Sequence, residues 1–546
     1  MNYLKNKDKK QERVKLSKAY PSGIFFIYLA LISLFISCSD NPEVELSSAA
    51  KLESFTFQSE HNVNLDQSVT GKISDLNIVT SIPYNTSLDG LVATFNYQGK
   101  SIHVGGVNQV SGVTANSFNK PVVYTITAED GTKTNYTVTA TNNLPRLPSV
   151  YINTAGGAPI VDKENYVNST IKIEDLDTYF SSEVSVTSSG RVKGRANSTW
   201  GMPKKPYRIK LDNNTSLLGM TSHKDWVLLA DYFDKTLLRN ITAFELSRIA
   251  EMSWTPTSIS VEFYLNGKYQ GVYALTEQVK VSEERFNIDL VKPTDISGEA
   301  LTGDYFLELD FHYDELFKFK TDGQKLPIMF KDPEEPTSKQ FAYVKDFFNN
   351  AESVLYSSNF KNQEDGYRKY IDVESFIDYY IVQELSNTVD GNMRGSCYLA
   401  LRRNGKIEQP LVWDFDLAFG NADYITWEQG ASSYDWDGWY IKTCSPWFDR
   451  FFEDPAFVAE LKKRWNELKP QLDQLPGFIK DNALMLDYAQ IRNFGPKANG
   501  GAGWDINLVE WNTNRVRGSY DAELIYLVSF VEKRIGWLHT NINNLN

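Results

Sequence analysis

The sequence predicts an α+β protein in which a small all-β module precedes one large mixed domain. Three observations predict this architecture. Apolar and polar residues alternate over residues 47–142, which is typical of half-buried strands. Residues 143–149 then contain two prolines, which keep a linker extended and interrupt any sheet. Beyond this linker, strand-like stretches continue to about Leu309 and helix-like stretches follow. With 546 residues, 42% of them hydrophobic, the chain can bury a core in each part.

Residues 1–37 are predicted to be a lipoprotein signal peptide. Seven Lys and Arg residues precede an apolar run from Gly23 to Ile36, which is too short to span a bilayer comfortably as a helix. The segment from Leu34 to Cys38 resembles the lipobox of bacterial lipoproteins, in which the cysteine becomes the lipidated first residue. We therefore expect an exported protein, held at the outer membrane or cell surface only by a lipid on Cys38, with a tether over residues 38–46. A simple N-terminal membrane anchor is the alternative.

The charge balance argues against a general nucleic-acid partner. Lys and Arg number 56 against 69 Asp and Glu, a formal net charge of −13. Loss of the leader would leave 49 basic and 67 acidic residues, a net charge of −18. A nucleic-acid binder needs an excess of Lys and Arg. The 3 cysteines also exclude a disulfide framework, although Cys397 could pair with Cys444, and the 5 scattered histidines lack the spacing of a zinc site.

The clearest hairpin of the chain lies near the end of the all-β module. Apolar residues alternate on both sides of an Asp130-Gly131 turn, namely Tyr124, Ile126 and Ala128 before it and Tyr136, Val138 and Ala140 after it. Several short strands within about 100 residues predict a β-sandwich. Residues 47–142 resemble the immunoglobulin-like modules at the N-termini of many surface lipoproteins, for which a spacer or adhesive role is expected.

Residues 150–546 are predicted to form one large domain. Helices are expected over Ser338 to Ser353, Val373 to Leu385 and Pro455 to Leu468. In the last of these, five apolar residues recur at helical spacing and should lie in the core: Phe457, Val458, Leu461, Trp465 and Leu468.

The densest polar cluster of this domain extends from Gly194 to Leu211. It begins as a small polar loop and continues as a strand in which Tyr207, Ile209 and Leu211 share one face. Five cations lie in it: Arg195, Lys204, Lys205, Arg208 and Lys210. Backbone donors and hydroxyls beside a cationic strand suit a polyphosphate. A surface strand with solvated charges is the alternative.

Two acidic segments follow. Asp414 and Asp416 interrupt the apolar stretch from Pro410 to Gly420, and in an extended strand they would project to the same side. Paired carboxylates repel unless a divalent cation neutralises them, although backbone amides or an arginine could also do so. Asp390 lies in a polar loop after a helix that ends near Leu385. It could accept a proton from an attacking hydroxyl, bind a metal, or form an Asp-Gly turn.

The order of these segments resembles the spore-coat CotH kinase family, a group of atypical protein kinases. Matching stretches also include Asp225 to Ala230, Asp234 to Asn240 and Val261 to Glu277, so the resemblance covers residues 150 to about 545. It implies a divergent protein-kinase-like fold and phosphoryl transfer from ATP with a divalent metal, Mg or Mn.

The resemblance also implies roles for individual residues. Lys210 would be the phosphate-binding lysine, with Glu277 as its ion-pair partner or a metal-site carboxylate. Asp390 would be the catalytic or metal-binding aspartate, and Asp414 and Asp416 would hold the metal. The phosphate side would further be lined by Arg195, Asn197, Ser198 and Lys204. The chain departs from the pattern at Ala196, where many relatives have glycine, and it lacks an ordinary kinase Gly-rich loop and a His-Arg-Asp motif.

The function that these features predict is a lipid-anchored kinase, which transfers the γ-phosphoryl group of ATP to Ser or Thr hydroxyls of a surface or exported protein. The main alternative is a non-enzymatic module that binds a glycan or a protein on a kinase-like scaffold. A glycoside hydrolase with a carboxylate pair would explain the acidic residues but not the basic cluster.

Overall fold

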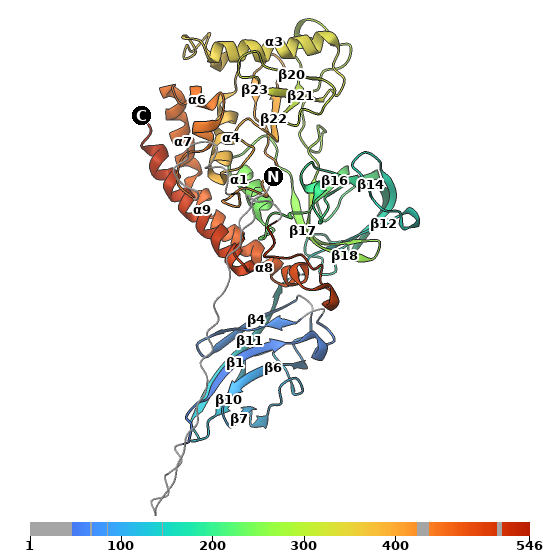
Figure 1. The fold of residues 1–546 in the computed structure, drawn as a ribbon, viewed down its shortest axis with the longest axis vertical. Coiled ribbons are helices and arrows are strands. Elements are labelled where there is room, and N and C mark those ends of the chain that lie inside the picture. Colours follow the sequence, from blue (N-terminus) through green and yellow to red (C-terminus); the bar gives the residue numbers. More distant parts are fainter. Residues whose placement is uncertain (1–45, 66–67, 84–85, 145, 423–435, 510–515) are drawn as a thin grey trace, which may run out of the picture.

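The computed structural model describes residues 46–546 except 66–67, 84–85, 145, 423–435 and 510–515. The predicted signal peptide and Cys38 lie outside the described residues. Among the residues that are described, no helix is long and apolar enough to cross a membrane. The prediction of an α+β protein with an all-β N-terminal region is confirmed (Figure 1).

The N-terminal region consists of three sheets around one core. A three-stranded sheet contains β2 (Val69–Thr70), β1 (Lys51–Phe57) and β6 (Thr94–Gln98). A six-stranded sheet contains, in order, β3 (Lys72–Ser74), β4 (Asn77–Pro83), β11 (Lys133–Leu144), β10 (Val122–Thr127), β7 (Ser101–Val104) and β8 (Val107–Asn108). A small pair joins β5 (Leu91–Val92) to β9 (Ala115–Asn116). The predicted hairpin is confirmed, because β10 and β11 pair antiparallel with Tyr124 opposite Tyr136.

Seven strands of the large domain form a closed barrel. Their order is β12 (Ser149–Thr154), β13 (Val167–Glu174), β14 (Ser185–Gly194), β15 (Tyr207–Thr215), β16 (His223–Leu229), β18 (Lys268–Glu277) and β17 (Ser258–Leu265). Parallel pairing of β12 with β17 closes it. Alternate residues of each strand fill the interior, among them Ile152, Ile209, Trp226 and Phe263, so the barrel centre is a packed core.

A second sheet and a group of helices complete the domain. The sheet contains β20 (Lys318–Lys320), β21 (Pro327–Asp332), β19 (Tyr305–Leu309), β22 (Cys397–Leu401) and β23 (Ile407–Glu408), with α3 (Ser338–Leu355) beside it in Figure 1. The main helical group contains α1 (Arg239–Ile249), α4 (Val373–Ser386), α7 (Pro455–Leu472), α8 (Leu475–Phe494) and α9 (Tyr520–Asn543). Short helices are α2 (Gly298–Leu301), α5 (Ile441–Cys444) and α6 (Phe448–Phe451).

The three predicted helices are confirmed as α3, α4 and α7, and the five apolar positions of α7 are buried. Cys397 and Cys444 are free thiols, so they form no disulfide.

A buried ion pair holds the end of α4 in place. Arg534 of α9 donates to Oε1 of Glu384 at 2.6 Å and to its carbonyl at 2.8 Å, and both side chains are almost fully buried. The Glu384 carboxylate also accepts the backbone N–H of Tyr440. Since α4 ends two residues later, this network fixes where the loop that contains Asp390 begins.

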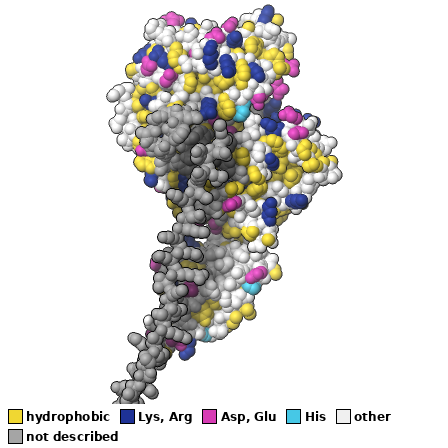
Figure 2. All heavy atoms as spheres, in the orientation of Figure 1, with side chains coloured by type: hydrophobic (Ala, Val, Ile, Leu, Met, Phe, Trp, Pro, Cys, Tyr) yellow, Lys and Arg dark blue, Asp and Glu magenta, His cyan; other side chains and the backbone are white. Residues whose placement is uncertain are grey.

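Charged side chains of both signs are mixed over the upper part of the face in Figure 2. The coloured atoms in this part of the face therefore show no extended area of a single charge sign.

Candidate active site

A cavity of ≈ 440 Å³ lies where the barrel, the second sheet and the helical group meet. Five segments line it: the β14–β15 loop, the segment between β16 and α1, the end of β19, the loop between α4 and β22, and the segment around Asp414. Six carboxylates contribute to its wall: Asp231, Glu308, Asp310, Asp390, Asp414 and Asp416. The basic side chains in the wall are Arg195, Arg394 and His312.

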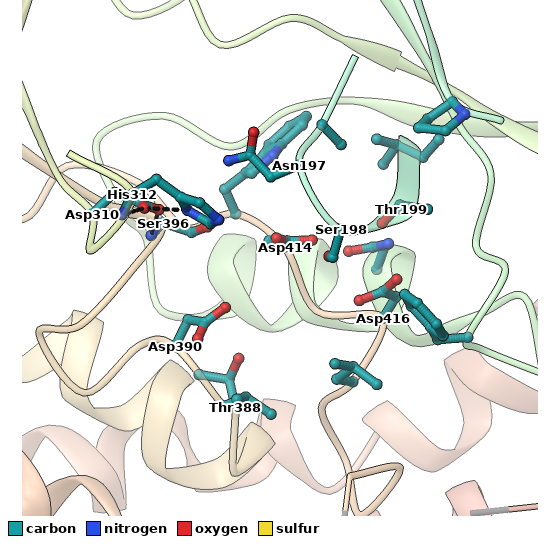
Figure 3. Close-up of a pocket in the computed structure, with 18 of the residues that line it drawn as sticks. Asn197, Ser198, Thr199, Asp310, His312, Thr388, Asp390, Ser396, Asp414 and Asp416 are labelled. Carbon is teal, nitrogen blue, oxygen red and sulfur yellow. Dashed lines mark hydrogen bonds and ion pairs between the residues drawn. The ribbon is translucent and has the colours of Figure 1, made fainter. Parts of the chain in front are cut away.

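Six of the residues predicted from the sequence meet in this cavity. They are Arg195, Asn197, Ser198, Asp390, Asp414 and Asp416. Figure 3 shows Asp414 near the centre, with Ser198 beside Asp416 and with Asp390 on the opposite side. Segments up to about 220 residues apart in sequence therefore line one cavity.

The segment around Asp414 is not the predicted strand. Residues 410–415 belong to no strand, a turn follows, and Asp414 has a φ of 71°. The prediction was wrong because contacts from distant elements fix this segment. The Phe415 N–H donates to Oδ1 of Asn240 at 2.8 Å, and the Phe419 N–H donates to the Ser386 carbonyl at 2.6 Å. Asp414 and Asp416 reach the same cavity without sharing a strand face.

The carboxylates of the cavity perturb one another. Burial, followed by repulsion from Asp414, raises the pKa of Asp390 to about 7. Burial also raises the pKa of Asp414, against the opposing charge of Arg195. The pKa of Asp416 lies well above its ordinary value because of burial and because Asp414 and Asp231 are near. Negative charge is thus concentrated here beyond what the neighbouring cations offset, and a bound cation would relieve it.

This donor set suits a hard divalent cation, since Mg²⁺ and Mn²⁺ prefer carboxylate oxygens. Within the described part of the chain, however, no three His, Cys, Asp or Glu side chains are close enough together to hold a metal ion by themselves. Mg²⁺ is commonly bound by one or two carboxylates together with waters and substrate phosphates. The cavity therefore suits a cation that shares its coordination with waters and an anionic ligand, and Asp414 and Asp416 are carboxylates in its wall that could contribute oxygens.

The basic side of the cavity is the β14–β15 loop. The Arg195 guanidinium lies 5.6 Å from the ring centre of Trp413 and faces the charge of Asp414. Ala196 has a φ of 63°, a conformation that favours glycine. Asn197 and Ser198 are exposed, and Asn197 accepts a hydrogen bond from Lys163 Nζ at 3.0 Å. This loop can offer donors to an anion opposite the carboxylates.

Lys210 and Glu277 do not line the cavity. Ile209 and Leu211 are buried in the barrel interior, so the alternation of β15 places Lys210 on the outer face of the barrel. Glu277 is buried at the end of β18, where its carboxylate accepts the Thr257 N–H at 2.9 Å and burial raises its pKa. The predicted pairing of these two residues at a nucleotide phosphate has no support in this geometry.

Lys204 lies behind the cavity wall and does not line it. Its buried Nζ donates to the Val272 carbonyl at 2.6 Å and lies 4.8 Å from the ring centre of Tyr273. Burial lowers the pKa of Lys204 to about 7, although the charge of Asp231 opposes this change. Lys204 can therefore influence Asp231 electrostatically without reaching a ligand in the cavity.

Comparison with known proteins assigns the large domain to a family. The family model described as CotH kinase protein matches residues 191–538. The chain belongs to the CotH kinase protein family. All five segments that line the cavity lie within this match. A second model, described as SGBP, N-terminal, matches residues 55–140.

No curated protein matches this CotH family chain. Two solved structures are similar to parts of it. One is described as a "putative secreted protein" of Bacteroides fragilis, with 19% identity over 17% of this chain and 95% of that one and a TM-score of 0.13. The other is described as a "putative glycoside hydrolase" of Bacteroides thetaiotaomicron, with 13% identity over 57% and 89% and a TM-score of 0.15. Neither likeness is close enough to bear on the function.

Sequence reasoning missed several cavity residues of the CotH domain. Asp231 follows β16 and Asp310 follows β19, so each is an acidic residue just beyond an apolar strand. Oδ1 of Asp310 accepts the His312 N–H at 2.8 Å and lies 2.6 Å from its Nδ1, while Oδ2 accepts the Ser396 N–H at 3.0 Å. The position of an acid at the end of a buried strand was the signal that could have identified both aspartates.

Proposed function

We propose that this protein is an active kinase that transfers the γ-phosphoryl group of ATP to Ser or Thr hydroxyls of a surface or exported protein. One observation carries the proposal. Asp390, Asp414 and Asp416 meet the polar loop of Arg195 and Ser198 in a single cavity, within the region that matches the CotH kinase family.

Phosphoryl transfer requires mainly positioning and neutralisation of charge. Mg²⁺ or Mn²⁺, bound with ATP, would neutralise the phosphate oxygens. Asp414 and Asp416 would hold the cation, and Arg195, Asn197 and Ser198 would contact the phosphates. Asp390, with a pKa of about 7, is suited to accept the proton of the Ser or Thr hydroxyl. The hydroxyl oxygen would then form a bond to the γ-phosphorus as the bond from the γ-phosphorus to ADP breaks.

The proposed location is the outer membrane or cell surface, with a lipid on Cys38 as the membrane contact. The basic and apolar leader and the segment from Leu34 to Cys38 support this proposal. Residues 47–142 would then be a module between the anchor and the kinase domain.

The test is transfer from labelled ATP to a generic protein acceptor by the full chain, with Mg²⁺ or Mn²⁺. Asp390→Asn and Asp414→Asn should each reduce transfer by a factor of about 10² or more, because each replaces a charged group by a neutral one of the same shape. Asp481→Asn, an exposed acid on α8, is the matched control and should transfer normally. Transfer at the wild-type rate in both Asp390→Asn and Asp414→Asn would contradict the proposal.

A second candidate is a non-enzymatic module that binds a glycan or a protein. It is favoured by the leader-like N-terminal segment, because ATP is scarce outside the cytoplasm, where an exported protein would act. Calorimetric titration with ATP and Mg²⁺ separates the two candidates. No measurable heat of binding for ATP with Mg²⁺, together with tight binding of a glycan or peptide, would favour the module.

A further inference from the structure

Asn240, on the first turn of α1, makes two hydrogen bonds that connect different parts of the cavity wall. Its side chain is 5% exposed and lines the cavity. Nδ2 donates to Oδ1 of Asp231 at 2.7 Å, and Oδ1 accepts the Phe415 N–H at 2.8 Å. One carboxamide thus contacts a cavity carboxylate and the backbone of the segment that contains Asp414.

The second of these bonds acts on a strained position. Asp414 has a φ of 71°, and a residue other than glycine keeps such a conformation only where its surroundings fix it. The Phe415 N–H belongs to the peptide unit directly after Asp414. By accepting it, Asn240 fixes the plane of that peptide, and with it the direction in which the Asp414 carboxylate projects.

Two neighbouring bonds join the same segments. Arg239 Nε donates to the Ala418 carbonyl at 3.0 Å, and Asn421 Nδ2 donates to the Phe233 carbonyl at 2.9 Å. Residues 231–240 and 414–421 are therefore connected at three points. Asn240 differs from the other two because it also contacts a cavity carboxylate.

We infer that Asn240 is a positioning residue, which holds Asp231 and Asp414 in a fixed relation across the cavity. Its structural role stands on the hydrogen bonds alone, whereas its effect on metal use and transfer rests on the proposed function. Without Asn240, the Asp414 carboxylate would no longer be held toward the ligand, and Asp231 would lose the donor that stabilises its charge.

Two variants of the full chain separate these bonds. Asn240→Ala removes both, whereas Asn240→Asp keeps an oxygen that can accept the Phe415 N–H and loses the donor to Asp231. Asn62→Ala is the matched control, because Asn62 is a buried asparagine of the N-terminal module that bonds to the Gln58 and Val92 backbones.

The readouts are hydrogen exchange of the peptide spanning residues 411–420, the Mn²⁺ concentration that gives half-maximal transfer, and the rate of transfer. In Asn240→Ala, the Phe415 amide should exchange roughly tenfold faster, because the hydrogen bond that protects it is lost. In Asn240→Asp its exchange should stay at the wild-type rate. Asn240→Ala should need more Mn²⁺, both variants should transfer more slowly, and Asn62→Ala should behave as wild type.

Unchanged exchange of the Phe415 amide in Asn240→Ala would overturn the inference, as would wild-type transfer with wild-type Mn²⁺ dependence. If the wild-type chain neither binds Mn²⁺ with ATP nor transfers phosphate, the proposed function fails instead. The exchange of the Phe415 amide then still decides whether Asn240 positions the Asp414 segment.

Discussion

The ion pair of Asp234 and Arg239 should be a main determinant of stability around the cavity. Both side chains are fully buried, and Nη1 of Arg239 lies 2.5 Å from Oδ1 of Asp234. The same carboxylate accepts the backbone N–H groups of Thr236, Leu238 and Arg239 at 2.8–3.0 Å, so it also satisfies the start of α1. Arg239 in turn donates to the Ala418 carbonyl. Asp234→Ala therefore disturbs the supports of two segments of the cavity wall.

The expected magnitude follows from what the substitution leaves behind. A buried guanidinium without its partner costs about 3–5 kcal/mol, and loss of a helix cap costs about 1 kcal/mol more if water cannot replace it. We expect Asp234→Ala to lower the free energy of unfolding by about 4–6 kcal/mol. The double variant Asp234→Ala/Arg239→Met removes both charges. Its loss should be smaller than the sum of the single losses by about 2 kcal/mol or more.

Urea unfolding monitored by tryptophan fluorescence, combined with hydrogen exchange of residues 414–421, measures this effect. Exchange is needed because a chain with several modules need not unfold in one step. Asp473→Ala, which removes an exposed ion pair with Lys469 in α7, should cost less than about 1 kcal/mol and serves as the control. A loss below about 1 kcal/mol for Asp234→Ala, or additive single variants, would refute the reasoning.

Three further predictions concern the site itself. Ala196→Gly should raise the free energy of unfolding by up to about 1 kcal/mol, because glycine adopts a φ of 63° without strain. A lower midpoint of thermal unfolding in this variant would contradict the prediction. Lys210→Met should change the affinity for ATP by less than about twofold in calorimetry, because Lys210 lies on the outer face of the barrel; a large loss would restore the role predicted from the sequence. Transfer should fall about tenfold per pH unit below pH 7, because Asp390 takes up a proton there and can no longer accept one from the hydroxyl; a flat profile between pH 5 and 7 would exclude Asp390 as the base.

The sequence predicted the elements whose signals are local. The alternation of apolar and polar residues identified the hairpin around Gly131, and apolar residues at helical spacing, such as Phe457 and Trp465, identified α7. It also identified Asp414, because an acid within an apolar stretch is costly and stands out, and Asp390, because it lies in a polar loop directly after a predicted helix.

The remaining features depend on contacts that no local pattern contains. The conformation of Asp414 is set by Asn240, which lies far away in the chain. The outward direction of Lys210 follows from β15 closing into a barrel, whereas the same alternation in an open sheet could have faced a ligand. Asp231 and Asp310 each lie just beyond an apolar strand, a signal that points to a site only once the ends of β16 and β19 are seen to meet at the cavity.

The closure of the barrel has a consequence for how the domain forms. The first strand of the barrel, β12, pairs with β17, so Ser149 can pair with Glu262 only after the four strands β13 to β16 and helix α1 have been synthesised. Until then, Val150 and Ile152 lack the core residues of β17 and β18 against which they pack in the folded barrel. Such long-range pairing is slow, because the entropic cost of closing a large loop comes before the stabilising contacts form. Apolar strands that are still unpaired can aggregate during this time. The barrel strands should therefore benefit from protection against aggregation until β17 has been synthesised.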